Sequence, residues 1–108
     1  MTGPLTPIPS RAASDDEIAA YRRDGVVCLR GIFPLDWIAF MGAAVDRAMA
    51  APGPHAEEYE PAEGGGRFFG DLDIWRRHTA FRRFVFESPA AAVVGALMGA
   101  TKVSFFYD

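Results

Sequence analysis

The sequence is poor in the residues that build disulfides and metal sites. It contains one cysteine, Cys28, and two histidines, His55 and His78, in 108 residues. A single cysteine excludes an internal disulfide and any cluster of thiolate ligands. Cys28 stands in an apolar run, whereas a reactive thiol needs an exposed and electropositive setting. We therefore expect a buried and unreactive cysteine in a strand.

Long hydrophobic runs are missing as well. No apolar stretch approaches the roughly 20 residues that a transmembrane helix needs, and the N-terminus lacks the basic and apolar regions of a signal peptide. We expect a cytoplasmic protein without a membrane partner. The net charge of -3 and the pI near 5.3 leave no surplus of positive charge. Nucleic acid is not expected as a partner, because phosphate binding needs that surplus.

The chain does have enough apolar sequence for one core. Half of its residues are hydrophobic and 23% are charged, which is typical of a single globular domain. Residues 1–13 contain three prolines and one glycine without periodicity, and they predict a flexible leader. Residues 14–108 form the predicted domain.

The segment from Gly66 to Glu87 is the richest in aromatic side chains. It holds six of the fourteen aromatic residues and five of the ten arginines. Aromatic residues supply most of the buried area in a small domain, so we expect this segment to cross the core. The arginines between Arg76 and Arg83 alternate with apolar residues at helical spacing, which indicates a solvated helix face.

Two helices are predicted in the N-terminal half. Ser14 and Glu17 form a capping box before a short helix, and Gly25 supplies its stop. Pro34 opens a second helix that runs to about Ala50. Its apolar residues follow a three-to-four spacing, which predicts one buried stripe. The stripe consists of Ile38, Met41, Val45 and Met49, widened by Trp37 and Phe40.

Two strands are also expected. The range from Val26 to Phe33 is apolar on both faces, and the range from Lys102 to Asp108 alternates as a strand does. The acidic segment from His55 to Gly66 predicts a long loop. We interpret its three glycines as a flexible connection and not as a phosphate cradle, because no GxxxxGK[ST] pattern is present.

Three shorter helices are predicted in the C-terminal half, each with its own start signal. The expected caps are Asp71 or Asp73 for a turn through Arg77, Thr79 for Ala80 to Glu87, and Ser88 for Pro89 to Met98. On the middle helix, Phe81, Phe84 and Val85 share one face. Arg82 and Arg83 share the other.

Few residues are candidates for chemistry. His55 and Glu57 have a spacing with which a strand could present two metal ligands, but no third ligand is in view. A surface histidine is the favoured reading there, and a capping or packing role is favoured for His78. Asp71 and Asp73 could serve acid-base chemistry, yet the neighbouring arginines favour caps and ion pairs. These residues define no catalytic or metal site on their own.

Four stretches of the chain look like the N-terminal portion of a phytanoyl-CoA dioxygenase family protein. They are DEIAAYRRDGVVCLRGIF, DWIAFMGAAVDRAMAAPGPHAEEY, GRFFGDLDIWRRHTAFRRFVFESPAAAVVGALMG and KVSFFYD. The resemblance covers residues 15–108. Its most specific part is RFFGDLDIWRRH, which points to one bacterial branch of the family.

The resemblance implies an α+β chain made of the N-terminal helices and first strands of a double-stranded β-helix, the jelly-roll or cupin-like fold. It also implies a non-haem Fe(II), 2-oxoglutarate-dependent hydroxylase, in which His-x-Asp and a later histidine hold the iron. In the family, His-x-Asp follows the strand that KVSFFYD resembles, and this sequence has no such motif. We therefore expect a chain that stops before the metal site and binds neither iron nor 2-oxoglutarate alone.

Two hypotheses follow for the chain. The first is an inactive N-terminal portion of a dioxygenase, with Arg67 and Tyr107 as contacts to a small-molecule substrate once a C-terminal portion completes the pocket. An aromatic strand without a neighbour would also favour self-association. The alternative is a small, non-catalytic binding or scaffolding module whose Arg-rich helix face meets an acidic partner. Charge reversal at Arg82 and Arg83 should then abolish partner recovery.

Overall fold

The computed structural model describes residues 4–59 and 64–108. Within these ranges the chain is an α+β protein with a helical layer and one small antiparallel sheet. The helices are α1 (Asp15–Asp24), α2 (Leu35–Ala50), α3 (Ile74–Arg77), α4 (Thr79–Glu87) and α5 (Ala90–Met98), and the strands are β1 (Glu57–Tyr59) and β2 (Phe68–Gly70). The described residues contain no double-stranded β-helix.

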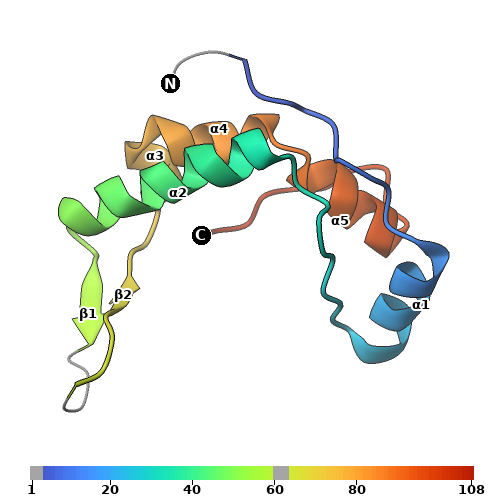
Figure 1. Ribbon diagram of the computed structural model, residues 1–108, viewed down its shortest axis with the longest axis horizontal. Coiled ribbons are helices and arrows are strands. Elements are labelled where there is room, and N and C mark those ends of the chain that lie inside the picture. Colours follow the sequence, from blue (N-terminus) through green and yellow to red (C-terminus); the bar gives the residue numbers. More distant parts are fainter. Residues whose placement is uncertain (1–3, 60–63) are drawn as a thin grey trace.

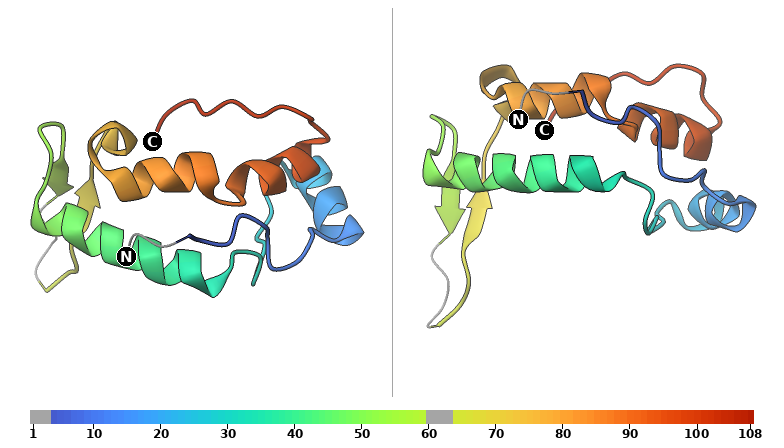
Figure 2. Two further views of the ribbon diagram at one scale, coloured as in Figure 1. Left: turned by 90° about the horizontal axis from the view of Figure 1, so that it is seen from above. Right: turned by 45° about the horizontal axis from the view of Figure 1, so that its top comes forward.

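The elements form an open arch. Helices α2, α3 and α4 make its top, the β1–β2 hairpin forms one leg, and α1 beside α5 forms the other (Figure 1). Figure 2 shows α2 running alongside α4 while the C-terminal segment returns past the same layer. The radius of gyration is 15.9 Å, against about 13 Å for a compact domain of this length. The arch therefore leaves much of its surface uncovered.

The core lies where α2 meets α4. Trp37 is only 1% exposed, and its ring contacts Phe40 and Phe84 edge-on with centroid separations of 5.8 and 5.9 Å. Phe33 stacks on Phe84 at 5.8 Å. The Trp37 indole Nε1 donates a hydrogen bond of 2.6 Å to the carbonyl of Thr6. This cluster, Trp37 with Phe33, Phe40 and Phe84, is called the Trp37 cluster below.

The start of α1 confirms the predicted capping box. The Glu17 amide donates to the Ser14 hydroxyl at 3.1 Å, and the Ser14 amide donates to a Glu17 carboxylate oxygen at 2.9 Å. Arg11 adds a two-point ion pair to Glu17, with separations of 2.7 and 2.9 Å. Gly25 ends the helix with a φ of 75°, a conformation that glycine adopts without strain. The predicted signals at both ends of this helix are therefore confirmed.

Residues 4–13 precede α1 without helix or strand, but they are tied to the segment before α2. The Ser10 amide donates to the carbonyl of Ile32 at 2.8 Å, and Arg11 donates to the carbonyl of Arg30. The hydroxyl and amide of Thr6 donate to Asp36, which lowers the pKa of that carboxyl. The leader segment thus lies over the N-terminal end of α2.

The two predicted strands from Val26 to Phe33 and from Lys102 to Asp108 are wrong. Neither range is a strand in the structure, because neither has a neighbouring strand to pair with among the described residues. Val26 is 71% exposed. Cys28 is also exposed, so the expectation of a buried thiol is wrong for the same reason. An apolar run is buried only where another element covers it.

The face that α2 buries agrees only in part with the predicted stripe, which included Trp37. Trp37, Ala44 and Ala48 are buried, whereas Ile38 and Val45 are 58% and 43% exposed. The buried residues keep the three-to-four spacing of a helix face, but the face includes alanines that let another element approach closely. Large side chains on the flank of α2 remain in solvent.

The acidic segment from His55 to Gly66 is not a loop throughout. Residues Glu57–Tyr59 form β1 and pair antiparallel with β2, with Glu58 opposite Phe69. The Tyr59 and Phe68 rings face each other at 5.2 Å across the pair. Residues 60–63 of the predicted loop lie outside the described part of the chain. The sequence also predicts a short extended piece from Arg67 to Gly70, and Phe68–Gly70 of it form β2.

Of the three predicted caps, only Asp73 stands directly before its helix, whereas α4 and α5 each begin one residue away from the expected start. His78, not Thr79, occupies the position before α4, and Thr79 is already helical. Asp73 precedes α3 with a φ of 53°, and its side chain caps no amide. The Ser88 hydroxyl accepts a hydrogen bond from the Ala90 amide at 3.2 Å, but Pro89 lies before α5 and not at its first position. No helix among the described residues is long and apolar enough to cross a membrane.

Candidate functional site

Arg67 directly precedes β2, on the turn side of the β1–β2 hairpin, and its donors are engaged. Its guanidinium forms an ion pair with Glu58, and Nη2 donates to the carbonyl of Met49 at 2.9 Å. The same group lies 5.4 Å from the centre of the Phe69 ring. Arg67 therefore ties the hairpin to the end of α2.

Tyr107 lies in the irregular segment after α5. Its side chain is 66% exposed, and its ring contacts the Phe106 ring at 4.8 Å. Neither Tyr107 nor Arg67 lines any of the three pockets described below. Their neighbours do come together, since Phe69 and Asp108 line one pocket. Substrate contact by Arg67 and Tyr107 stays a prediction.

That pocket, the Asp108 pocket, has a volume of about 260 Å³ and opens between α2, β2, α3 and α4. Its apolar lining comes from Val45, Ala48, Met49, Phe69, Ile74 and Phe81, and its polar residues are Asp71 and Asp108. The Asp108 carboxylate reaches this place because its Oδ2 atom accepts a hydrogen bond of 3.0 Å from the Trp75 amide.

The two carboxylates of the Asp108 pocket have unequal partners. Asp71 is 4% exposed at its side chain, and it accepts hydrogen bonds from Arg77 at 2.8 Å and from the amides of Leu72 and Gly53. Burial acts to raise the pKa of Asp71, but these hydrogen bonds outweigh it and the pKa lies below its ordinary value. Asp108 differs, because its Oδ1 atom is buried and accepts no hydrogen bond from the described residues.

A second arrangement places two arginines on aromatic rings at the surface. The Arg76 guanidinium lies 4.7 Å from the centre of the Trp75 ring. Arg82 lies 4.9 Å from the Phe86 ring centre and 5.8 Å from that of Trp75. We call Trp75, Arg76, Arg82 and Phe86 the Arg–aromatic face.

Arg83 does not belong to this face, contrary to the expected pairing with Arg82. Its side chain is only 16% exposed, lies 5.2 Å from the Phe40 ring centre, and forms an ion pair of 3.2 Å with Glu87. The position on the helix turns Arg83 towards α2 and Arg82 towards solvent.

An apolar groove of about 470 Å³ runs between α4, α5 and the C-terminal segment. Its lining is formed by Phe84, Val85, Phe86, Ala90, Ala91, Val94 and residues 103–106. Phe106 is 89% exposed and Phe86 is 61% exposed. The segment from 102 to 108 makes no backbone hydrogen bond to the described residues. It is held instead through side chains, since Phe105 contacts Trp75 at 5.6 Å.

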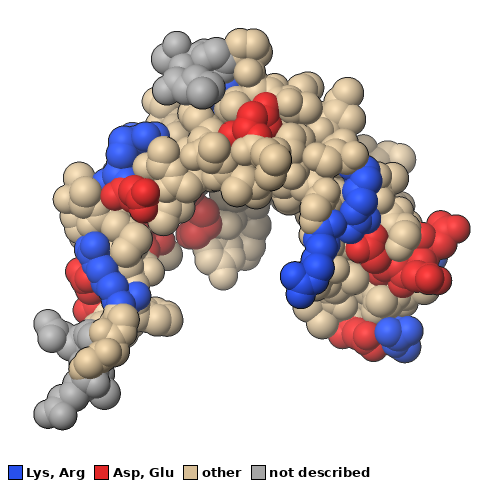
Figure 3. All heavy atoms as spheres, in the orientation of Figure 1, with Lys and Arg blue, Asp and Glu red and all other residues tan. Residues whose placement is uncertain are grey.

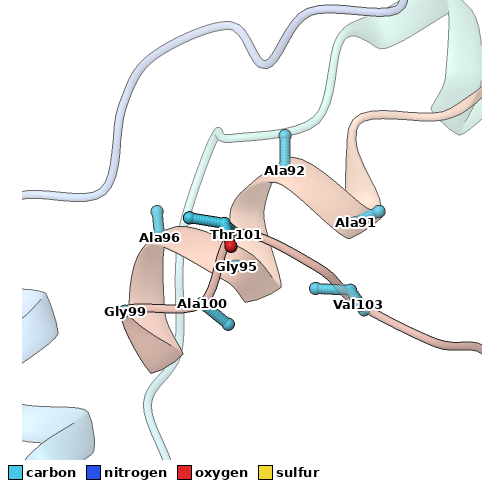
Figure 4. A pocket seen from close by; sticks show the side chains of 8 residues that line it. All are labelled: Ala91, Ala92, Gly95, Ala96, Gly99, Ala100, Thr101 and Val103. Atoms are coloured by element: carbon cyan, nitrogen blue, oxygen red, sulfur yellow. The ribbon is translucent and has the colours of Figure 1, made fainter.

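A hollow of about 380 Å³ continues along the small residues of α5 (Figure 4). Gly95 is needed there, because a Cβ atom would come within 3.0 Å of the Ala100 carbonyl oxygen. Thr101 is the one lining residue with a polar side chain, so this hollow has few side-chain groups that could bind or react with a ligand. Figure 3 shows one face of the molecule, on which most charged residues gather towards the two ends of the arch and one acidic patch lies near its top.

The remaining candidates from the sequence do not form a site. Asp71 points to Gly53 and Arg77, whereas Asp73 lies 3.8 Å from Arg76, so the two carboxylates have separate roles. His78 contacts the Phe81 ring at 5.9 Å. Residues 4–59 and 64–108 contain no group of three or more histidine, cysteine or acidic side chains that could hold a metal ion. The described residues therefore do not provide the two histidines and one carboxylate with which the family resemblance would hold iron.

Comparisons with protein-family models, with curated proteins and with solved structures found no match for the chain. The feature that sequence reasoning missed is the contact between Asp108 and Trp75. These residues are 33 positions apart. No local sequence pattern predicts that the Asp108 side chain accepts a hydrogen bond from the first turn of α3.

Proposed function

We propose that this chain is the helical wall of a non-haem Fe(II), 2-oxoglutarate-dependent dioxygenase of the phytanoyl-CoA dioxygenase family, working in the cytoplasm. In this role it packs against the double-stranded β-helix of the enzyme and closes one side of the substrate pocket. The resemblance over residues 15–108 supports the family. The chain itself carries no His-x-Asp, so we assign it no step of oxygen chemistry.

The observation that carries the proposal is the uncovered apolar surface beside an unpaired extended segment. The chain exposes 7763 Å², whereas a compact protein of 11.8 kDa exposes about 5,900 Å². The difference exceeds the roughly 800 Å² that one partner buries in a standard interface. A sheet edge laid along residues 102–108 would pair their free backbone groups and cover the apolar groove.

Within that assembly the described residues have positioning roles. Phe105 and Asp108 fix the extended segment on α3, and the Trp37 cluster holds α4 beneath it. Arg67 and Tyr107 are the proposed substrate contacts, and their sequence neighbours Phe69 and Asp108 line the same pocket. The Tyr107 side chain is exposed beside the Phe106 ring, and Arg67 would have to exchange its Glu58 partner for a substrate anion.

The test begins with the nucleotide sequence downstream of the Asp108 codon, translated in all three forward frames. A continuation with His-x-Asp and a later histidine is expected. The extended protein should then consume 2-oxoglutarate in an Fe(II)-dependent and substrate-dependent reaction, and replacement of the His-x-Asp histidine by alanine is the matched control. Absence of such a continuation would overturn the proposal.

A second candidate function is supported by the Arg–aromatic face. Arg82 lies over two rings and has no carboxylate partner among the described residues, so its donors are free for an acidic ligand. Stacking holds the guanidinium in place and reduces the entropy cost of binding. In this reading the chain is a non-catalytic binding module for an acidic peptide.

Charge reversal separates the two functions. The double variant R76E/R82E should lose binding of a labelled oligoglutamate peptide, measured by fluorescence anisotropy at low salt. The double variant R30E/R47E is the matched control, because it reverses the same number of charges at two exposed arginines outside this face. An equal loss of peptide binding in the control variant would show that net charge alone explains the effect. It would contradict specific binding by the Arg–aromatic face. Arg83 is unsuitable for this test, since its partner Glu87 would be disturbed as well.

A further inference from the structure

The Asp108 pocket combines an apolar body with one unmatched charge. Asp71 is balanced by Arg77, while Asp108 receives only the Trp75 amide on Oδ2. The buried Oδ1 atom of Asp108 has no donor among the described residues. A buried carboxylate oxygen without a donor is costly, so a ligand that donates to it gains an interaction that solvent does not already supply.

The rest of the lining limits what that ligand can be. Phe69 and Phe81 present aromatic rings, and Met49 and Ile74 add apolar contact. Ring faces attract cations, and apolar walls favour a ligand with a hydrocarbon body. The volume of about 260 Å³ lies just below the usual range for small-molecule sites, which favours a ligand of few atoms.

We propose that the Asp108 pocket binds a small organic ammonium ion, whose N–H donates to Oδ1 of Asp108 while its hydrocarbon body contacts Phe69 and Phe81. The site is separate from the proposed dioxygenase function, because it uses only residues of this chain and needs no completed barrel. A bare metal ion fits less well. The Asp108 side chain offers one oxygen without a donor, whereas Mg²⁺ and Ca²⁺ take six or more oxygen ligands.

The experiment is a titration of the full chain with n-butylammonium chloride, followed by methyl NMR of Ile74 and Ala48. We expect saturable shifts at both residues, and 1-butanol should bind at least about tenfold more weakly, because it lacks the charge-assisted hydrogen bond. Butanol binding of equal strength would overturn the proposal, since the pocket would then be merely apolar.

Asp108→Asn keeps the size of the side chain and places an amide where the carboxylate was. It should weaken n-butylammonium binding about tenfold or more, whereas Asp16→Asn, a matched charge change on exposed α1, should leave it within about twofold. Full binding by Asp108→Asn, or equal loss in both variants, would contradict the site.

Magnesium chloride serves as the last probe. Shifts of Ile74 and Ala48 produced by Mg²⁺ alone, lost in Asp108→Asn, would replace the organic ligand by an inorganic one and overturn the proposal. Absence of any saturable shift with n-butylammonium would leave Oδ1 to a water molecule and would also overturn it.

Discussion

Trp37 and Phe105 both belong to aromatic clusters, yet the two clusters are covered to very different extents. Trp37 is closed in on all sides at 1% exposure, and its indole N–H has a carbonyl partner. Phe105 contacts Trp75 but remains 42% exposed, on a segment whose backbone pairs with nothing among the described residues. Aromatic content therefore does not locate a core; the elements that cover the rings do.

The largest expected effect comes from breaking the Trp37 cluster. Trp37→Ala should lower the free energy of unfolding by about 3–5 kcal/mol, because it leaves a cavity between α2 and α4. Phe105→Ala should cost less than about 1.5 kcal/mol, since solvent already reaches much of the ring. Urea denaturation of both variants measures the difference. Equal losses in the two variants would show that Phe105 contributes to the core as much as Trp37 does.

The next effect concerns the buried ion pair beside the Asp108 pocket. Arg77→Ala removes one partner of Asp71 and should lower the free energy of unfolding by about 1–3 kcal/mol. Arg76→Ala on the same helix should cost less than about 1 kcal/mol, because Arg76 is 65% exposed. Thermal or urea denaturation tests whether Arg77→Ala is the less stable of the two variants.

Gly53→Ala should disturb the same ion pair by steric contact, because its new Cβ would collide with the Arg77 guanidinium.

The capping box at α1 should give a smaller loss. Ser14→Ala removes the acceptor for the Glu17 amide and should lower the free energy of unfolding by about 1 kcal/mol. Ser14→Asp is the matched control, because aspartate caps a helix as well as serine does. An alanine variant as stable as the parent would mean that α1 is held by its contact with α5 alone.

The free energy of unfolding should also depend on pH through the protonation of Glu17. Hydrogen bonds from Arg11 and from the Ser14 amide lower the pKa of Glu17 to about 2. A lowered pKa in the folded state means that this contribution is complete above the unfolded pKa near 4.5 and is lost as pH falls towards 2. NMR titration should find the pKa, and Arg11→Ala should move it upwards. An unchanged pKa in that variant would contradict the ion pair.

The smallest effect on stability is expected at Phe106, which is 89% exposed. Phe106→Ser should change the free energy of unfolding by no more than about 0.5 kcal/mol. It should nevertheless reduce concentration-dependent association, because the ring is part of an uncovered apolar groove next to unpaired backbone. Light scattering across a range of concentrations measures this. Unchanged association would assign self-association to another surface.

Features set by neighbouring residues could be predicted from the sequence. The capping box of Ser14 and Glu17, the stop at Gly25 and the long helix after Pro34 all depend on contacts within a few positions. Pairing between distant segments could not. The run from Val26 to Phe33 has the composition of a strand, but no strand lies beside it in the described structure. Cys28 is exposed as a result.

The candidate site shows the same limit. The sequence predicts Arg67 as a substrate contact; in the structure Arg67 contacts Phe69, and the substrate contact stays a prediction. The oxygen of Asp108 that lacks a partner is buried because of the path that the chain takes after α5. The spacing of apolar residues in the sequence does not predict that path. The buried face of α2 was misjudged for a related reason. Ala44 and Ala48 are covered because of what packs on them, although larger residues lie beside them in sequence.

The contact between α1 and α5 has a consequence for the order of folding. These helices pack together although they lie near opposite ends of the described chain. During synthesis α1 leaves the ribosome well before α5 exists, so it has no partner in that interval. No residue of α1 is buried, which leaves the capping box and the Arg11 ion pair as its own support. We expect α1 to dock late and to exchange its amide hydrogens early.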